Sequence, residues 1–177
     1  MTGQEIEAIV NGYHGDAFGI LGPHSVRKKN ATPRWEVRAF LPQAETAVVM
    51  AGATRCAMEK RHPQGFFVAA MDGDPGPYVI HARLWDGREV EIDDPYRFGP
   101  QISDSDLYLH TEGTLHEAWR SLGAHIVTAE GATGVRFAVW APNAENVTLA
   151  GEFNDWDIRR QPMRRRNGGV WEILVPG

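Results

Sequence analysis

The chain has 177 residues, of which 42% are hydrophobic and 23% are charged, a composition typical of a globular rather than a disordered protein. Its net charge of -5 argues against nucleic acid as the main partner, and no apolar run approaches the about 18 residues that a membrane-spanning helix needs. The single cysteine, Cys56, excludes an intrachain disulfide framework and, with no signal-peptide pattern at the start, favours a cytoplasmic location.

The first part of the chain is predicted to form a short helix followed by β-strands. Thr2 and Glu5 have the spacing of a capping box, which predicts a helix that begins there and ends near Gly12. Asp86-Gly87 predicts a tight hairpin between the last two strands. Alternating or β-branched residues predict strands in WEVRAFLP (35–42), TAVVMA (46–51), GFFVAAM (65–71), GPYVIHARLW (76–85) and EVEIDD (89–94).

The second part repeats this pattern. Thr114 and Glu117 have capping-box spacing again and predict a second helix that ends near Gly123. Residues 37–52 match residues 137–152 at an offset of 100, and LGPH at 21–24 matches LGAH at 122–125. The sequence therefore predicts two copies of one module. Strands are predicted in GVRFAVWAP (134–142), NVTLAG (146–151) and GVWEILV (169–175).

These elements predict a mainly β chain, built from two tandem immunoglobulin-like β-sandwich modules with short connecting helices. The expected boundaries are 1–101 for the first module, 102–126 for a helical linker and 127–177 for the second module. The second copy lacks counterparts of GPYVIHARLW and EVEIDD, so we expect it to be truncated and the chain to be part of a longer protein. An open second sandwich would bury three aromatic residues poorly: Trp140, Phe153 and Trp171.

Five stretches resemble the N-terminal part of bacterial glycogen branching enzymes: DAFGILGPH (16–24), DDPYRFGP (93–100), GVRFAVWAPNAENVTLAGEFNDWD (134–157), RRQPMRRR (159–166) and GVWEILVPG (169–177). The third is similar to the signature of the family-48 carbohydrate-binding module. The resemblance implies an extra N-terminal β-sandwich, then a partial family-48 module, with the catalytic (β/α)8 barrel absent from this chain. The implied parent is a glycosyltransferase that moves α-1,4-glucan segments to α-1,6 branch points in glycogen biosynthesis.

The candidate carbohydrate-binding residues are Trp156 and Asn154. An indole offers a flat apolar surface to the C–H face of a sugar, and an Asn amide can bond to sugar hydroxyls. The resemblance implies that the Trp matching Trp156 stacks on glucose. A structural alternative stays open, in which Trp156 packs on the barrel or stabilises its own turn.

No catalytic residue, metal site or cofactor is predicted. Retaining glucan chemistry needs two carboxylates about 5 Å apart. The candidate pairs lie in turn-like stretches, where carboxylates usually cap backbone amides: Asp93/Asp94, Asp104/Asp106 and Asp155/Asp157. The seven histidines lack metal-ligand spacing. The arginine-rich stretch RRQPMRRR (159–166) is interpreted as a solvated loop or as a contact with acidic groups of a neighbouring domain.

Two functions are therefore expected. The first is a non-catalytic portion of a branching enzyme that positions glucan and influences the length of the transferred chain. The alternative is a structural segment that braces the barrel and has no useful sugar affinity. The expected partners are α-1,4-glucan or glycogen and the barrel of the same polypeptide, with neither nucleic acid nor membrane among them.

Overall fold

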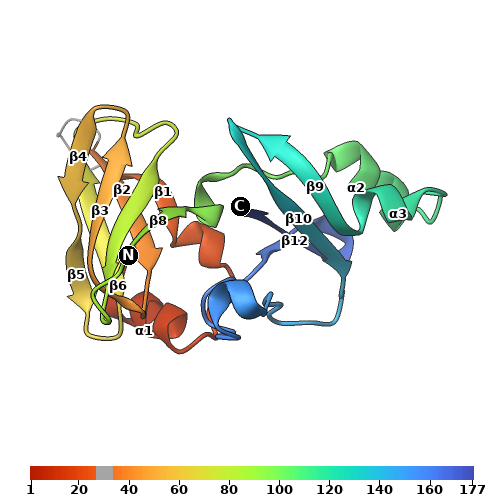
Figure 1. Cartoon of the computed structure of the whole chain (residues 1–177). Helices are drawn as coiled ribbons and strands as arrows, with labels where there is room; N and C mark the ends of the chain where they lie inside the picture. The colour runs from red at the N-terminus through yellow and green to blue at the C-terminus, as the bar shows by residue number, and fades with distance from the viewer. Residues whose placement is uncertain (27–33) are drawn as a thin grey trace. The chain divides into compact units, whose positions relative to one another are not determined.

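The computed structural model describes residues 1–26 and 34–177, which divide into two compact units (Figure 1). Unit 1 comprises Met1–Asn11 and Phe18–Arg97, and unit 2 comprises Gly12–Ala17 and Phe98–Gly177. Within the described residues the strands form three antiparallel sheets of four strands each. The prediction of a mainly β chain built from β-sandwich modules is confirmed.

Unit 1 contains a helix, α1 (Gly3–Val10), and two sheets. The helix begins as predicted, because the Thr2 side chain accepts a hydrogen bond from the Glu5 N–H at 3.3 Å and the Glu5 carboxylate accepts from the Thr2 N–H. Sheet 1 has the order β1-β2-β6-β5 and sheet 2 the order β4-β3-β7-β8. The bounds are η1 (Ala17–Gly19), β1 (Gly22–Val26), β2 (Arg34–Phe40), β3 (Ala44–Ala51), β4 (Thr54–Ala57), β5 (Glu59–His62), β6 (Phe66–Met71), β7 (Val79–Leu84), β8 (Glu89–Asp93) and η2 (Pro95–Arg97).

The two sheets of unit 1 enclose a common apolar core. Side chains alternate along each strand, so every second residue faces inward. The inward residues of both sheets are almost completely buried and belong to one cluster, which includes Val37, Ala39, Val49, Phe67 and Ile80. This arrangement is the β-sandwich that the sequence predicts for the first module.

The hairpin between β7 and β8 forms at the predicted place. Arg83 pairs with Glu89 across the two strands, and the Leu84 N–H donates to the Arg88 carbonyl at 2.8 Å. Gly87 has a φ of +86°, which explains why glycine occupies this turn position. The turn leaves the side chain of Trp85 63% exposed.

Unit 2 contains sheet 3, with the order β11-β12-β10-β9, and short helical segments. On one face of the sheet, Ala138 and Val170 pack against Ile102 and Leu107. The bounds are α2 (Asp104–Thr111), α3 (Ala118–Ser121), β9 (Gly123–Ala129), β10 (Ala132–Trp140), η3 (Glu152–Asn154), β11 (Arg164–Arg165), η4 (Asn167–Gly169) and β12 (Val170–Pro176).

Sheet 1 and sheet 3 repeat each other residue by residue. Their strand orders correspond, with β1, β2, β6 and β5 matching β9, β10, β12 and β11. The internal repeat detected in the sequence is therefore a repeat of backbone pairing as well. The register of the matching pairs is the same: Gly22–Arg38 and Gly123–Ala138, Ala39–Phe67 and Val139–Trp171, Lys60–Phe67 and Arg165–Trp171.

The second predicted capping box is wrong. Helix α2 is capped by Ser103, whose side chain accepts from the Asp106 N–H at 3.0 Å. Thr114 lies beyond the end of this helix, and its hydroxyl donates back to the Leu109 carbonyl. Gly113, with a φ of +73°, turns the chain there, so Thr114 closes one helix instead of starting the next.

Residues 146–151 do not form the predicted strand. They contribute one isolated bridge, between Thr148 and Pro162, which corresponds to the Val48–Ala57 pair of β3 and β4. In unit 1, β3 also pairs with β7, whereas the described residues of unit 2 contain no strand in that position. With so few backbone partners, the segment does not extend into a ladder.

The expected poor burial of aromatic residues in unit 2 is found for two of the three residues. Trp140 is 56% exposed and Phe153 is 50% exposed. The expectation for Trp171 is wrong, because this residue is fully buried. Its indole N–H donates to the Ala141 carbonyl at 3.0 Å, and the guanidinium of Arg165 lies 5.6 Å from the ring centroid.

Candidate carbohydrate-binding site

The candidate site lies on the turn after η3 in unit 2. The backbone N–H groups of Asn154 and Trp156 both donate to the Gly151 carbonyl, at 3.2 and 2.9 Å. Asp155 and Trp156 have φ values of +56° and +58°, a left-handed conformation that costs free energy for residues other than glycine. This turn leaves the Trp156 side chain 68% exposed. Trp156 is therefore placed where a flat ligand could stack on its ring.

Asn154 is fully buried, and its side chain stabilises the turn through hydrogen bonds. Its Oδ1 accepts a hydrogen bond from the Gly151 N–H at 2.9 Å. Its Nδ2 donates to the Leu149 carbonyl at 2.9 Å and to the Gln161 side chain. Because the amide oxygen and nitrogen are both bonded within the protein, the side chain fixes the turn that presents Trp156 and exposes no atom to a ligand in this structure.

Each aspartate beside Trp156 pairs with an arginine. Asp155 Oδ2 lies 2.9 Å from Arg160 Nη1, and Asp157 Oδ2 lies 2.7 Å from Arg159 Nη2. The hydrogen bonds from Arg159 lower the pKa of Asp157 below its ordinary value. A carboxylate held in its ionised form is a poor proton donor, so Asp157 does not suit general acid catalysis. The residues on either side of Trp156 in the sequence are therefore both engaged in ion pairs.

The other carboxylates considered as catalytic pairs are buried or bonded to side chains of their own units. Asp94 is buried, and the remaining three bond to nearby side chains. The ion pairs are Asp93–Arg97 and Asp104–Arg166, each at 2.8 Å, and Asp106 accepts a hydrogen bond from the Ser121 hydroxyl at 3.2 Å.

The arginine-rich stretch 159–166 belongs to the scaffold of unit 2, so its interpretation as a solvated loop is wrong. Arg164 donates to the Phe98 carbonyl at 2.9 Å. Arg166 bonds to the carboxylate of Glu172, which is 2% exposed and also accepts from the Ile102 N–H at 2.9 Å. These bonds join the segment before α2 to β12.

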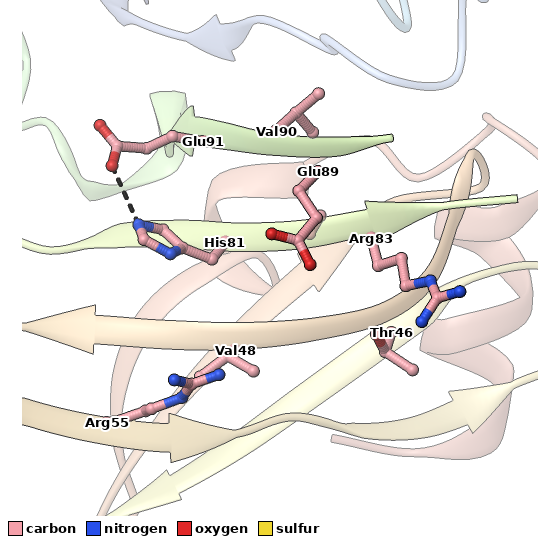
Figure 2. Close-up of a pocket in the computed structure, with 9 residues that line it drawn as sticks. Thr46, Val48, Arg55, His81, Arg83, Glu89, Val90 and Glu91 are labelled. Atoms are coloured by element: carbon pink, nitrogen blue, oxygen red, sulfur yellow. Dashed lines mark hydrogen bonds and ion pairs between the residues drawn. The ribbon is translucent and has the colours of Figure 1, made fainter. Parts of the chain in front are cut away.

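A groove of about 450 Å³ lies on sheet 2 of unit 1, and Figure 2 shows the residues along it. Two of its lining residues have ion-pair partners: His81 Nε2 lies 2.9 Å from Oε2 of Glu91, which also lines the groove, and Arg83 Nε lies 3.5 Å from Oε2 of Glu45, which does not. None of its nine lining residues is Trp, Tyr or Phe. The groove therefore lacks the flat apolar surface on which a sugar ring stacks.

Among residues 1–26 and 34–177, no group of three or more His, Cys, Asp and Glu side chains could hold a metal ion. No helix in the same part of the chain is long and apolar enough to cross a membrane.

Trp85 is one of several exposed aromatic residues that sequence reasoning missed. The sequence did contain a signal for it, because Trp85-Asp86-Gly87-Arg88 and Trp156-Asp157-Ile158-Arg159 share the pattern Trp-Asp-x-Arg. This pattern falls outside the repeat alignment, since the two tryptophans do not occupy equivalent positions in the two modules.

Comparison with known proteins gives matches along most of the chain. The family described as alpha-1,4-glucan branching enzyme GlgB, N-terminal domain, matches residues 2–96, and carbohydrate-binding module 48 (isoamylase N-terminal domain) matches residues 121–177. A protein named 1,4-alpha-glucan branching enzyme GlgB from Paramagnetospirillum magneticum is 44% identical over 174 residues, and one from Rubrobacter xylanophilus is 48% identical over 177 residues.

These matches cover nearly all of this chain but less than a quarter of each relative. Each alignment includes 98% of this chain but 23% of the length of the relative. Among solved structures, GBS pullulanase SAP in complex with maltotetraose matches 85% of this chain and 20% of that chain, with a TM-score of 0.22 and 14% sequence identity. A TM-score that low carries no argument about fold or function.

Proposed function

The chain belongs to the family of GlgB N-terminal domains, and from this premise we propose that it is the non-catalytic N-terminal portion of a glycogen branching enzyme. In this proposal the parent transfers α-1,4-glucan segments to α-1,6 branch points. The present chain positions the glucan and influences the length of the segment transferred. The catalytic barrel belongs to the remainder of the parent and is the second partner of this chain.

The observation that carries the proposal is the exposed indole of Trp156 on a turn built to present it. Two left-handed residues cost free energy, and the buried Asn154 amide offsets that cost with hydrogen bonds to Gly151 and Leu149. An exposed ring held in one conformation loses little entropy when a sugar stacks on it. Trp156 is the proposed sugar platform, and Asn154 is the residue that positions it.

Three further features belong to the same proposal. The α-1,4-glucan or glycogen is the ligand of the 121–177 module, in line with the carbohydrate-binding family that matches there. A cytoplasmic location is supported by the single cysteine, Cys56, which forms no intrachain disulfide. The division into 1–101, 102–126 and 127–177 also stays a proposal, with β9 beginning inside its middle segment.

A glycogen pull-down tests the proposed sugar contact. The 177-residue chain should sediment with glycogen, and Trp156→Ala should weaken that binding about fivefold or more, because one stacked ring is lost. Trp119→Ala is the matched control, since Trp119 is 65% exposed in the same unit but lies in α3. It should bind as the unchanged chain does.

Equal binding by Trp156→Ala and the unchanged chain would support the alternative, a segment that braces the barrel without useful sugar affinity. The non-catalytic part of the proposal has its own test. Purified chain mixed with amylose should leave the iodine-stain spectrum unchanged, and a shift toward the spectrum of branched glucan would refute it.

A further inference from the structure

Trp85 and Trp156 are surrounded by the same local arrangement. In each case the aspartate that follows the tryptophan accepts a hydrogen bond from the backbone N–H two residues on, at 3.0 Å. The same aspartate binds the side chain of that residue, an arginine: Asp86 Oδ2 lies 2.7 Å from Arg88 Nε, and Asp157 Oδ1 lies 2.9 Å from Arg159 Nε. The exposed fractions of the two tryptophans are close, at 63% and 68%.

The Trp85 ring is held in place by contacts within unit 1. Its indole N–H donates to the Pro42 carbonyl at 3.2 Å, and its backbone N–H donates to the Gln43 carbonyl at 3.2 Å. The Lys60 ammonium lies 4.4 Å from the ring centroid and also donates to the Ala44 carbonyl at 3.2 Å. The ring is thus fixed in orientation while most of its surface faces solvent.

These features distinguish Trp85 from a general apolar contact surface. Protein–protein interfaces are depleted of Asp and Lys, whereas Trp85 is followed by Asp86, whose side chain is 52% exposed, and has the Lys60 ammonium over its ring. A sugar ring needs both kinds of contact, because it has an apolar C–H face and polar hydroxyls. A sugar therefore fits the surroundings of Trp85 better than an apolar protein surface does.

We propose that Trp85 is a second α-1,4-glucan contact, located in the first module. A glucose ring stacks on the indole, Asp86 accepts hydrogen bonds from its hydroxyls, and Arg88 donates to them. Lys60 is a positioning residue that keeps the indole in place. The choice of α-1,4-glucan rests on the proposed function, whereas binding at Trp85 is tested separately from binding at Trp156.

The test is a titration of the isotope-labelled 177-residue chain with maltoheptaose, followed by the indole N–H signals in proton–nitrogen NMR spectra. Trp85→Phe and Trp156→Phe identify the two signals and keep an aromatic ring at each site. We expect the Trp85 and Trp156 signals to shift with sugar concentration while the Trp119 signal stays in place. In a Trp156→Ala background, Trp85→Ala should remove the remaining binding, and Trp119→Ala should leave it unchanged.

Each outcome separates the two hypotheses. If the indole N–H signal of Trp156 shifts and that of Trp85 does not, the second contact is overturned and the proposed function stands. If only the Trp85 signal shifts, the second contact is supported and Trp156 is removed as a platform. If neither signal shifts, both hypotheses are overturned. Equal shifts of Trp85 with maltoheptaose and with the β-1,4-linked cellohexaose overturn the assignment to α-1,4-glucan.

Discussion

Sheet 1 of unit 1 and sheet 3 of unit 2 keep the same register although their side chains differ. In both, the carbonyl of a glycine just before one strand accepts a hydrogen bond from the residue just after its paired strand: the Leu41 N–H donates to the Gly65 carbonyl at 2.8 Å, and the Ala141 N–H donates to the Gly169 carbonyl at 2.9 Å. A Cβ atom on Gly65 would lie 2.5 Å from the Leu41 carbonyl oxygen. Close backbone approaches of this kind therefore recur at the same place in the two sheets.

The two units differ in what covers the inward face of this sheet. Ala39 in unit 1 lies under sheet 2 and is 4% exposed, whereas its counterpart Val139 is 42% exposed. Phe67 and its counterpart Trp171 are buried in both units. The part of the shared face at Phe67 and Trp171 is therefore buried in both units, whereas the part at Ala39 and Val139 is buried only in unit 1.

The largest effect on stability is expected at Phe67 and Trp171, the matching residues that are buried in both units. Phe67→Ala and Trp171→Ala should each lower the free energy of unfolding of their own unit by about 3–5 kcal/mol, because each leaves a large cavity. Phe153→Ala, at a half-exposed ring, should cost less than about 1 kcal/mol. Urea unfolding followed by resolved amide signals from each unit measures all three. A small loss in Trp171→Ala alone would mean that its burial does not match that of Phe67.

Amide hydrogen-exchange rates should differ between the two units in the segments where their backbone pairing differs. Residues 44–51 form β3, which pairs with β4 and β7, whereas residues 144–151 contain a single bridge. We expect the amides of 44–51 to exchange on average about 100-fold more slowly, since their opening requires wider unfolding. Residues 134–140 of β10 provide the internal standard for unit 2. Equal rates in 44–51 and 144–151 would contradict the contrast in backbone pairing.

Unit 1 should become more stable at mildly acidic pH because of Asp94. Burial raises the pKa of Asp94 to about 6, and its carboxylate accepts hydrogen bonds from the Tyr78 hydroxyl and the Tyr96 N–H. The folded state then binds the proton more tightly than the unfolded state. Lowering the pH from 7 to 4 should therefore add about 2–3 kcal/mol from this group to the free energy of unfolding.

The Asp94→Asn variant isolates this contribution. Urea unfolding of unit 1 at pH 7 and pH 4 gives the free energy for both proteins. The unchanged chain should gain stability relative to Asp94→Asn as the pH falls through about 6. The same pH dependence in both proteins would show that Asp94 is not the responsible group.

The smallest effect concerns one histidine in each module. His24 Nε2 lies 2.9 Å from the Leu21 carbonyl, and His125 Nε2 lies 2.8 Å from the Leu122 carbonyl. If these bonds close equivalent turns, His24→Ala and His125→Ala should each cost about 1 kcal/mol in their own units. Thermal unfolding measures the loss of stability in each variant. A loss of stability in only one of them would mean that the two turns are not equivalent and that the structural repeat extends only to the strands.

The sequence predicted the features that depend on local spacing. The capping box at Thr2, the β7–β8 hairpin at Asp86-Gly87 and the paired modules all appear in the structure. The same capping pattern failed at Thr114, because α2 already ends at Thr111 and Gly113 turns the chain. Local spacing cannot distinguish a residue that starts a helix from one that closes the helix before it.

Features that depend on distant partners were not predictable in this way. Residues 146–151 have the composition of a strand but meet only Pro162 in a bridge, and a strand needs neighbours for its backbone groups. At the candidate site, Trp156 is 68% exposed, and its role as a sugar contact stays a proposal beside the packing alternative. The burial of Asn154 depends on Leu149 and Gln161 enclosing its amide, which sequence spacing does not reveal.

The measurement that tests the proposed function most directly is an NMR experiment that detects short proton–proton distances between the 177-residue chain and bound maltoheptaose. We predict cross-peaks between the indole ring protons of Trp156 and the C–H protons of glucose, with no cross-peaks from the Asn154 side chain, which is fully buried. Bound sugar whose cross-peaks lead only to residues away from Trp156 would contradict the assignment of this indole as the glucan platform.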